Sequence, residues 1–211
     1  MSNTKPEAPL KAEEATTRRT RARRAAPHVR SEQILDAAVE VLLERGLPAT
    51  TMDQIARTAG IGKGTMYLYF ESKTQILAAL RTRWVERALV SCNSAALYGR
   101  QVSTLTRVER FIEALFDATA ADRLLLGILF REAGLEDHNE ISLVRDDLLR
   151  HVREGIRSGD LEVRDPEIVV SFLLHGVYGV FVEALTSGDA NHKQLLSAVR
   201  RIIRLQLSRQ E

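Results

Sequence analysis

The sequence is poor in the residues on which several classes of protein depend. Its 211 residues include a single cysteine, Cys92, which excludes a disulfide framework or a multi-cysteine metal site and suits a reducing cytosol. The longest uncharged apolar run, residues 168–182, falls short of the ~20 apolar residues that a membrane span requires. The N-terminus also lacks the apolar segment of a secretory signal. We therefore expect a soluble, cytoplasmic protein that does not associate with a membrane.

Proline is also scarce, and residues 49–165 contain none. This stretch is rich in Ala, Leu, Arg and Glu and has few alternating β-branched residues, which predicts an all-α fold of about nine helices. We expect the first helix to begin at a cap on Ser31 and to end at Gly46. The later helices are predicted near residues 104–119, 121–133, 139–158, 166–186 and 191–208.

Positive charge is concentrated at the N-terminus. Residues 1–30 hold eight Lys or Arg against three Glu, a net charge of +5, so that residues 31–211 carry −3. Segment 1–29 is poor in large apolar side chains and cannot form a core, so we expect a disordered basic arm. Two interpretations fit this arm: a solvated tail, or a segment that follows DNA phosphates. Its arginine cluster consists of Arg18, Arg19, Arg21, Arg23 and Arg24.

Two capping boxes mark the starts of helices in the N-terminal third of the chain. In each, a hydroxyl residue is followed three positions later by glutamine, so that each side chain can bond the other residue's backbone amide. The two pairs are Thr51 with Gln54, and Ser72 with Gln75. The first pair opens a short helix that Gly60 ends, and the second opens a long amphipathic helix.

Between the two capping boxes, a second short helix is predicted over residues 63–70. Met66 and Phe70 lie four residues apart and share the face that anchors this helix to a core. Two short helices joined by a glycine-containing turn form a helix-turn-helix if the second can enter a DNA major groove. An ordinary helical hairpin is the alternative. The residues turned wholly or partly outward are Lys63, Gly64, Thr65, Tyr67 and Tyr69.

The chemistry of these outward residues suits DNA. Lys63 supplies a donor for a phosphate or a guanine, and Thr65 offers a hydroxyl together with a methyl group that can meet a thymine methyl. Gly64 inside a helix costs ~1 kcal/mol relative to alanine, which suggests a place where the DNA backbone approaches closely.

The string from Arg30 to Leu80 resembles the N-terminal domain of the TetR family of bacterial transcriptional regulators. The resemblance implies a helix-turn-helix DNA-binding domain over residues 30–75 and a C-terminal regulatory and dimerisation domain over residues 76–211. The features that carry it are Gly46, Thr50, Thr51, Ile55, Ala56, Ala59, Gly60, Lys63, Gly64, Tyr67, Phe70 and Lys73.

The resemblance also implies roles for the matched residues. Thr51 corresponds to a phosphate contact at a helix N-terminus, and Lys73 to a lysine that holds the DNA backbone. Lys63, Gly64, Thr65, Tyr67 and Tyr69 match the recognition-helix positions that face DNA. Tyr69 replaces a frequent histidine of the family, so the operator sequence is not implied. Placed before this domain, the basic arm is expected to enter the minor groove.

Residues 166–186 are apolar on nearly every face, which indicates a helix buried on several sides. In the resembled family, the last two helices pair with the same two helices of a second subunit. The resemblance therefore implies a homodimer, whose two-fold symmetry matches an approximately palindromic operator. Burial within one subunit is the alternative. The expected interface residues are Phe172, Val177, Phe181, Leu195, Val199 and Ile202.

A pocket for a small-molecule effector among the middle helices is likewise implied by the resemblance. For each candidate lining residue, plain core packing is the simpler interpretation. His175 is the titratable member of the set, amid apolar neighbours. The candidates are Trp84, Phe111, Phe130, His175 and Tyr178, with Cys92 and Phe116 beside them.

An enzyme is the rival class. None of the five histidines has a glutamate three residues before it, as a di-iron bundle requires, and nucleophile-elbow, phosphate-loop and zinc-protease motifs are missing. Residues Glu132, Glu136, Asp137, His138 and Glu140 indicate a polar loop, and we expect no metal and no cofactor. The predicted function is a homodimeric, sequence-specific DNA-binding repressor that a small molecule releases from its operator. A ligand-independent DNA-binding regulator or an architectural protein is the alternative.

Overall fold

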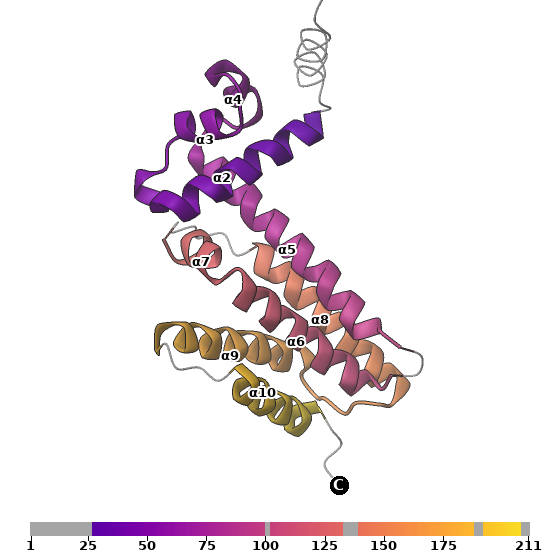
Figure 1. Cartoon of the computed structure of the whole chain (residues 1–211). Helices are drawn as coiled ribbons and strands as arrows, with labels where there is room; N and C mark the ends of the chain where they lie inside the picture. Colours follow the sequence, from indigo (N-terminus) through magenta and orange to yellow (C-terminus); the bar gives the residue numbers. More distant parts are fainter. Residues whose placement is uncertain (1–26, 100–101, 133–138, 188–191, 208–211) are drawn as a thin grey trace, which may run out of the picture.

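The computed structural model describes residues 27–99, 102–132, 139–187 and 192–207, and within these ranges the chain is helical without a strand (Figure 1). The predicted all-α fold is confirmed. None of the described helices has the length and apolarity needed to cross a lipid bilayer. The elements are α2 (Pro27–Ala49), α3 (Met52–Thr58), α4 (Lys63–Tyr69), α5 (Lys73–Leu97), α6 (Thr104–Ala121), α7 (Arg123–Leu126), the π-helix η1 (Gly127–Glu132), α8 (Asn139–Ser158), α9 (Pro166–Ser187) and α10 (His192–Leu207).

Helix α2 begins earlier than the sequence predicted. It starts at Pro27, so the expected cap on Ser31 is wrong and Ser31 lies within the helix. Proline suits a first helical turn because the N–H that it lacks has no partner there. The predicted break at Gly46 is confirmed, since its φ of 73° and ψ of 169° lie outside the helical region and favour a residue without Cβ.

Two buried apolar clusters divide the fold. The N-terminal cluster joins α2, α3 and α4 to the first turns of α5, and it encloses Met66 and Leu80. The C-terminal cluster lies among α5, α6, α8, α9 and α10, and it encloses Val85 and Phe111. Helix α5 therefore takes part in both clusters, and the packing divides it between Leu80 and Val85, further along the chain than the predicted boundary at residues 75/76.

The segment that was predicted as one helix over residues 121–133 is instead α7 followed by η1. Although it belongs to the C-terminal half of the chain, its side chains Leu125, Ile128 and Leu129 are buried in the N-terminal cluster. The wider winding of a π-helix is rare and frequently occurs at functional sites. Helices α7 and η1 thus form a second connection, besides α5, between the two halves.

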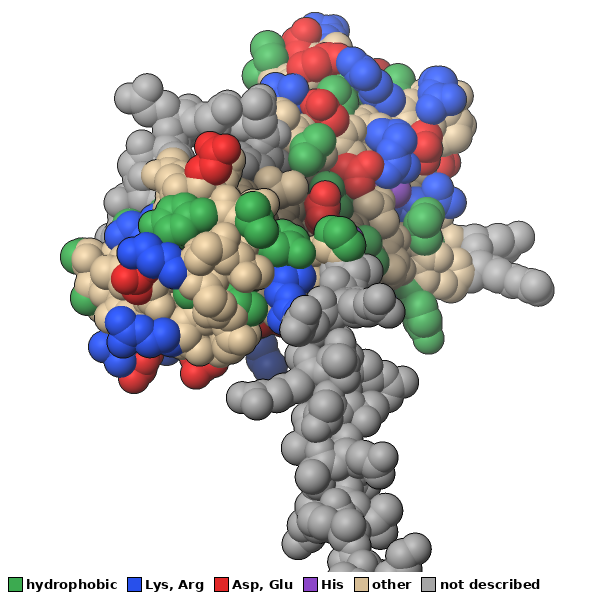
Figure 2. Space-filling view, turned by 90° about the horizontal axis from the view of Figure 1, so that it is seen from above, with side chains coloured by type: hydrophobic (Ala, Val, Ile, Leu, Met, Phe, Trp, Pro, Cys, Tyr) green, Lys and Arg blue, Asp and Glu red, His purple; other side chains and the backbone are tan. Residues whose placement is uncertain are grey.

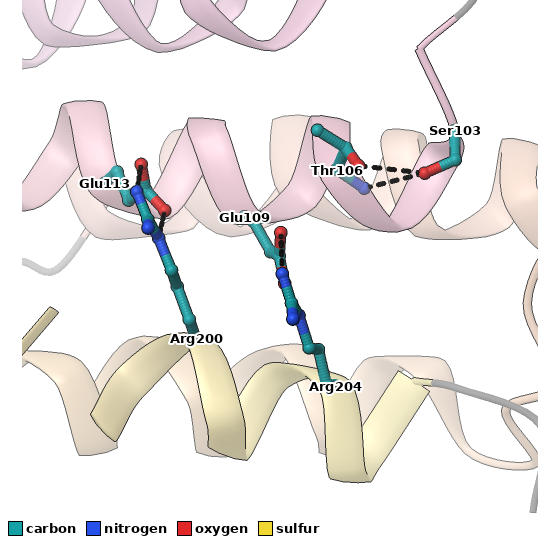
Figure 3. A network of polar contacts seen from close by, with 6 residues as sticks. All are labelled: Ser103, Thr106, Glu109, Glu113, Arg200 and Arg204. Atoms are coloured by element: carbon teal, nitrogen blue, oxygen red, sulfur yellow. Dashed lines mark hydrogen bonds and ion pairs between the residues drawn. The ribbon is translucent and has the colours of Figure 1, made fainter. Parts of the chain in front are cut away.

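Helices α6, α8, α9 and α10 begin and end within two residues of their predicted ranges. Two arginines of α10 hold this helix against α6 (Figure 3). Arg200 Nη2 donates to Glu113 Oε2 at 2.8 Å, and Arg204 Nε donates to Glu109 Oε1 at 2.6 Å. These ion pairs fix the side of α10 that faces the subunit and therefore also the side that faces outward.

Candidate nucleic-acid interface

The first capping box forms as the sequence predicted. The Thr51 amide donates to Gln54 Oε1 at 2.9 Å, and the Gln54 amide donates to Thr51 Oγ1 at 3.3 Å. The second box is only half formed. The Gln75 amide donates to Ser72 Oγ at 3.2 Å, whereas Gln75 Oε1 accepts from the Glu71 amide at 2.7 Å. Both caps fix the direction in which their helices leave the turn, and Thr51 stands exposed at the start of α3.

Helix α4 is anchored by one face and leaves the opposite face open. Met66 is fully buried and Phe70 is nearly so, as their four-residue spacing predicted. Lys63, Gly64 and Tyr67 are exposed, which agrees with the expected outward face. Thr65 and Tyr69 are half-buried, and Tyr69 packs against the N-terminal cluster.

The sequence-based list of outward residues missed Leu68, which is 82% exposed. A helix advances about 100° per residue, so a position midway between Met66 and Phe70 falls on the side opposite them. The spacing alone was sufficient to find this residue, and only its apolar character argued for burial. An exposed leucine at this point gives α4 an apolar group suited to a thymine methyl.

Gly64 has open space where a side chain would stand, since a Cβ built there meets nothing within 4 Å among the described residues beyond its own neighbours and the adjoining helix backbone. Its lack of a side chain therefore has no explanation in packing within the subunit. The neighbouring Lys63 is paired, because its Nζ lies 3.1 Å from Asp53 Oδ1 in α3. The hydrogen bond to Asp53 raises the pKa of Lys63 above its ordinary value.

Lys73 has a structural role that the sequence did not reveal. Its Nζ donates to the carbonyl oxygen of Leu47 near the end of α2 at 2.9 Å and to that of Thr50, just before α3, at 3.1 Å. An ammonium group has three hydrogens to donate, so one remains for another acceptor. Lys73 thus fastens α5 to the start of the helix-turn-helix, and its contact with DNA stays a prediction.

Three groups of predicted residues lie outside the described part of the chain. The basic arm, with Arg18, Arg19, Arg21, Arg23 and Arg24, precedes residue 27. The side chains of the polar loop from Glu132 to Glu140 are likewise not described. Phe181 lies within α9, but its side chain is outside the description too.

The structure does not bring the predicted effector-binding residues together. Trp84 and Phe130 form one pair, with ring centroids 6.3 Å apart, and the Trp84 Nε1 donates to Asp122 Oδ2 at 2.9 Å. Phe111 lies elsewhere, fully buried in the C-terminal cluster. His175 and Tyr178 are exposed on α9 rather than buried, and their part in an effector pocket stays a prediction. Of its apolar neighbours in the sequence, Leu173, Leu174 and Val177 face the core, whereas Phe172 is exposed like His175 itself.

A histidine that the sequence did not single out is buried instead. His151 of α8 is 1% exposed, packs against the Phe111 ring and shares a 3.0 Å hydrogen bond with Asn93 Oδ1. The Asn93 amide group donates to Leu89 O and to Asp147, so Oδ1 is its acceptor and His151 Nε2 is the donor. Burial lowers the pKa of His151, which keeps the imidazole neutral.

The predicted dimer residues divide between core and surface. Val177 and Val199 are buried in the C-terminal cluster of the single chain, so their assignment to the interface is wrong, and Leu195 also packs against that cluster. An all-apolar helix does not reveal which face its own subunit covers. The apolar residues that stand exposed along α9 and α10 are Ile168, Phe172, Tyr178, Ile202 and Leu205.

A recessed area on α9 lies within this apolar face, lined by Ile168, Ser171, Phe172 and His175 with Glu167 at its edge. Phe172 is 63% exposed, which is unusual for a large apolar side chain of a solitary subunit. Exposed apolar faces of this kind are typical of interaction surfaces, and two of the residues expected to form an interface, Val177 and Val199, are not on this one.

Two short helices, of which the second is anchored on one side and open on the other, define a helix-turn-helix DNA-binding protein.

A family model described as "Bacterial regulatory proteins, tetR family" matches residues 34–80 of the chain. The fatty acid metabolism regulator protein of Bacillus subtilis is 27% identical over 173 residues, which cover 77% of this chain and 84% of that protein. The transcriptional regulator BetI of Rhizobium meliloti is 38% identical over 84 residues, 38% of this chain and 41% of that protein.

Solved structures share the fold over most of the chain. The fatty acid degradation regulator FadR from Bacillus halodurans has a TM-score of 0.68 at 22% identity, covering 85% of this chain and 96% of that one. FadR from Bacillus subtilis, in complex with stearoyl-CoA, has a TM-score of 0.67 at 23% identity, with 82% and 96% covered. Residues 34–80 therefore belong to a TetR-family DNA-binding domain, and the chain is a DNA-binding transcriptional regulator.

Proposed function

We propose that this regulator is a homodimeric repressor that binds an approximately palindromic operator and leaves it when an acyl-CoA occupies the C-terminal half. The observation that carries the proposal is the orientation of α4, where buried Met66 and Phe70 turn Tyr67 and Leu68 outward. In this arrangement the outward residues enter the major groove, and Lys63 and Thr65 lie beside them. Thr51, Tyr69 and the free hydrogen of Lys73 contact the phosphates, and the arginines of the arm follow the minor groove.

The exposed apolar face of α9 and α10 supports the dimer. Phe172, Ile202 and Leu205 meet the same residues of a second copy, because a two-fold interface uses one patch twice. Such a dimer places two copies of α4 on one side, about one helical turn of DNA apart, which is roughly 34 Å. Two half-sites in inverted orientation are therefore the expected operator.

The acyl-CoA class of effector is drawn from relatives. One relative is named as a regulator of fatty acid metabolism, and one similar structure contains stearoyl-CoA. In this chain, the side chains of the C-terminal cluster are the apolar groups that an acyl chain entering that half would contact. Trp84 of α5 packs against Phe130 of η1, and Phe130 also packs against the N-terminal cluster. A ligand that contacts this pair therefore also contacts η1, which connects the two halves.

Two elements transmit occupancy of the C-terminal half to α4. Helix α5 runs from Lys73 at the helix-turn-helix into the C-terminal cluster, and α7 with η1 places Leu129 in the N-terminal cluster. A ligand that shifts either element changes the separation of the two α4 helices. Coupling of this kind amounts to about 1–3 kcal/mol and is reciprocal, so operator DNA weakens ligand binding by the same factor.

The proposal is tested with DNA from upstream of the protein's own gene, labelled for fluorescence anisotropy. Wild-type protein is expected to bind as a dimer and to be released by stearoyl-CoA, while free coenzyme A at the same concentration releases none. Binding of DNA that stearoyl-CoA and shorter acyl-CoAs leave unchanged supports a ligand-independent regulator and contradicts the effector part of the proposal.

A further inference from the structure

The helix-turn-helix carries little net positive charge for a surface that meets DNA. Residues 50–75 contain three cations and two carboxylates. Two of the cations have partners within the protein, Lys73 on carbonyl oxygens and Lys63 on Asp53. On the face in Figure 2, acidic and basic side chains are interspersed rather than sorted by sign. The pairing of Lys63 with Asp53, at the start of α4, therefore needs an explanation, because it removes a cation from a surface that meets DNA.

Asp53 and Lys63 connect the two helices of the motif directly. Asp53 lies in the first turn of α3 and Lys63 is the first residue of α4. The Lys63 Nζ lies 3.1 Å from one carboxylate oxygen and 3.3 Å from the other, and both side chains remain about half exposed. The pair is therefore open to solvent and to any DNA that approaches α4.

We propose that Asp53 is a specificity-determining residue, which holds Lys63 away from phosphates and so weakens binding to DNA of unrelated sequence more than binding to the operator. This inference rests on the proposed contact between α4 and DNA. On unrelated DNA, the protein gains affinity from phosphate contacts, each of which releases a counterion. A lysine already neutralised by a carboxylate contributes little to that gain.

At the operator, the pairing of Asp53 with Lys63 weakens DNA binding much less than it does on unrelated DNA. Lys63 retains two hydrogens beyond the one it gives to Asp53, and these can reach the O6 and N7 acceptors of a guanine in the major groove. The carboxylate then orients the ammonium toward a base edge. Contacts from Thr65, Tyr67 and Leu68 supply the remaining affinity, and they are made only when the sequence matches.

A purely structural role for Asp53 predicts the opposite result. A carboxylate in the first turn of a helix interacts favourably with the helix dipole. If this were its only function, Asp53→Asn would loosen α3 and weaken binding to every DNA. The sign of the change in affinity for unrelated DNA therefore separates the two roles, and thermal unfolding reports any loss of stability independently.

The experiment compares full-length wild-type, Asp53→Asn and Asp53→Glu proteins on two duplexes of equal length. One is the tightest-binding duplex that the wild-type protein selects from random sequences, and the other is an unrelated duplex. Asp53→Asn is expected to bind the unrelated duplex about three- to tenfold more tightly, and to steepen its slope of log affinity against log salt by about one. Affinity for the selected duplex changes less than threefold, and Asp53→Glu behaves like the wild type.

Two further variants locate the effect. Asp146→Asn removes another exposed, paired carboxylate, the partner of Arg145 on α8, and it is expected to leave the salt slope unchanged. In a Lys63→Gln background, the gain from Asp53→Asn is expected to shrink by at least half, because no cation is released.

Three results overturn the inference: an unchanged salt slope in Asp53→Asn, an equal gain on both duplexes, or a gain that persists in full without Lys63. A wild-type protein that selects no sequence contradicts the proposed function itself. The inference therefore fails separately from the proposal on which it rests.

Discussion

Arg204 of α10 donates from Nε to the buried carboxylate of Glu109 on α6, at 2.6 Å from Oε1. The two partners differ sharply, since the Glu109 side chain is 7% exposed and the Arg204 side chain is 62% exposed. Together with the neighbouring pair of Arg200 and Glu113, this contact fixes how α10 lies on α6 (Figure 3). Because Ile202 and Leu205 stand exposed on the same helix, the pair also sets the proposed dimer face.

The difference in exposure predicts unequal effects of removing each partner. Arg204→Met leaves a buried, unpaired carboxylate and is expected to lower the free energy of unfolding by about 3 kcal/mol. Glu109→Met leaves an arginine that water can solvate, and the loss is expected to be about 1 kcal/mol or less. Urea unfolding of both variants measures the two values. Equal losses would mean that the pair contributes through packing rather than through charge.

The exposed face of α9 predicts a dimer that one surface substitution breaks. Phe172→Glu places a charge where the same residue of the second copy is expected, while the side chain leaves no cavity because it is already 63% exposed. We expect a monomer by light scattering that still unfolds cooperatively, with a melting temperature that no longer depends on protein concentration. The matched control is Val90→Glu, at another exposed apolar position on α5. A Phe172→Glu dimer would place the interface elsewhere.

The buried His151 predicts a loss of stability in mild acid. Its pKa is lowered by burial, so below the ordinary value of 6.5 the unfolded chain binds a proton that the folded chain does not. The free energy of unfolding therefore falls as the pH drops below about 6.5, and above that pH His151 causes no such loss.

His151→Gln keeps an N–H donor for Asn93 but does not titrate. Between pH 7.5 and pH 5.5, we expect the variant to lose less unfolding free energy than the wild type in urea titrations, since the other titrating groups are common to both. Parallel pH profiles would show that the wild-type imidazole is accommodated in its charged form.

The sequence was sufficient for the helices and for the anchored face of α4, because these depend on local signals. The Thr51 cap, the Gly46 break and the spacing of Met66 and Phe70 act over a few residues, and all three appear in the structure. The start of α2 was missed because Ser31 offered an apparent cap while Pro27 was equally compatible with a first turn.

What the sequence left open depends on contacts between distant segments. Helix α9 is apolar all round, so nothing in its pattern places Val177 in the core and Phe172 outside. The carbonyl oxygens that hold Lys73 belong to residues far back along the chain. The pairing of Asp53 with Lys63 likewise joins two helices across a turn whose geometry the pattern does not specify.

The central claim is that the outward face of α4 reads the operator, and anisotropy titrations of Leu68→Ala and Tyr67→Ala test it most directly. Each variant is compared with Leu97→Ala, an exposed leucine at the far end of α5, on the selected duplex and on an unrelated one. We predict that each α4 variant weakens binding to the selected duplex by about 1–3 kcal/mol and leaves binding to the unrelated duplex unchanged. Undiminished affinity for the selected duplex in both variants would contradict the claim.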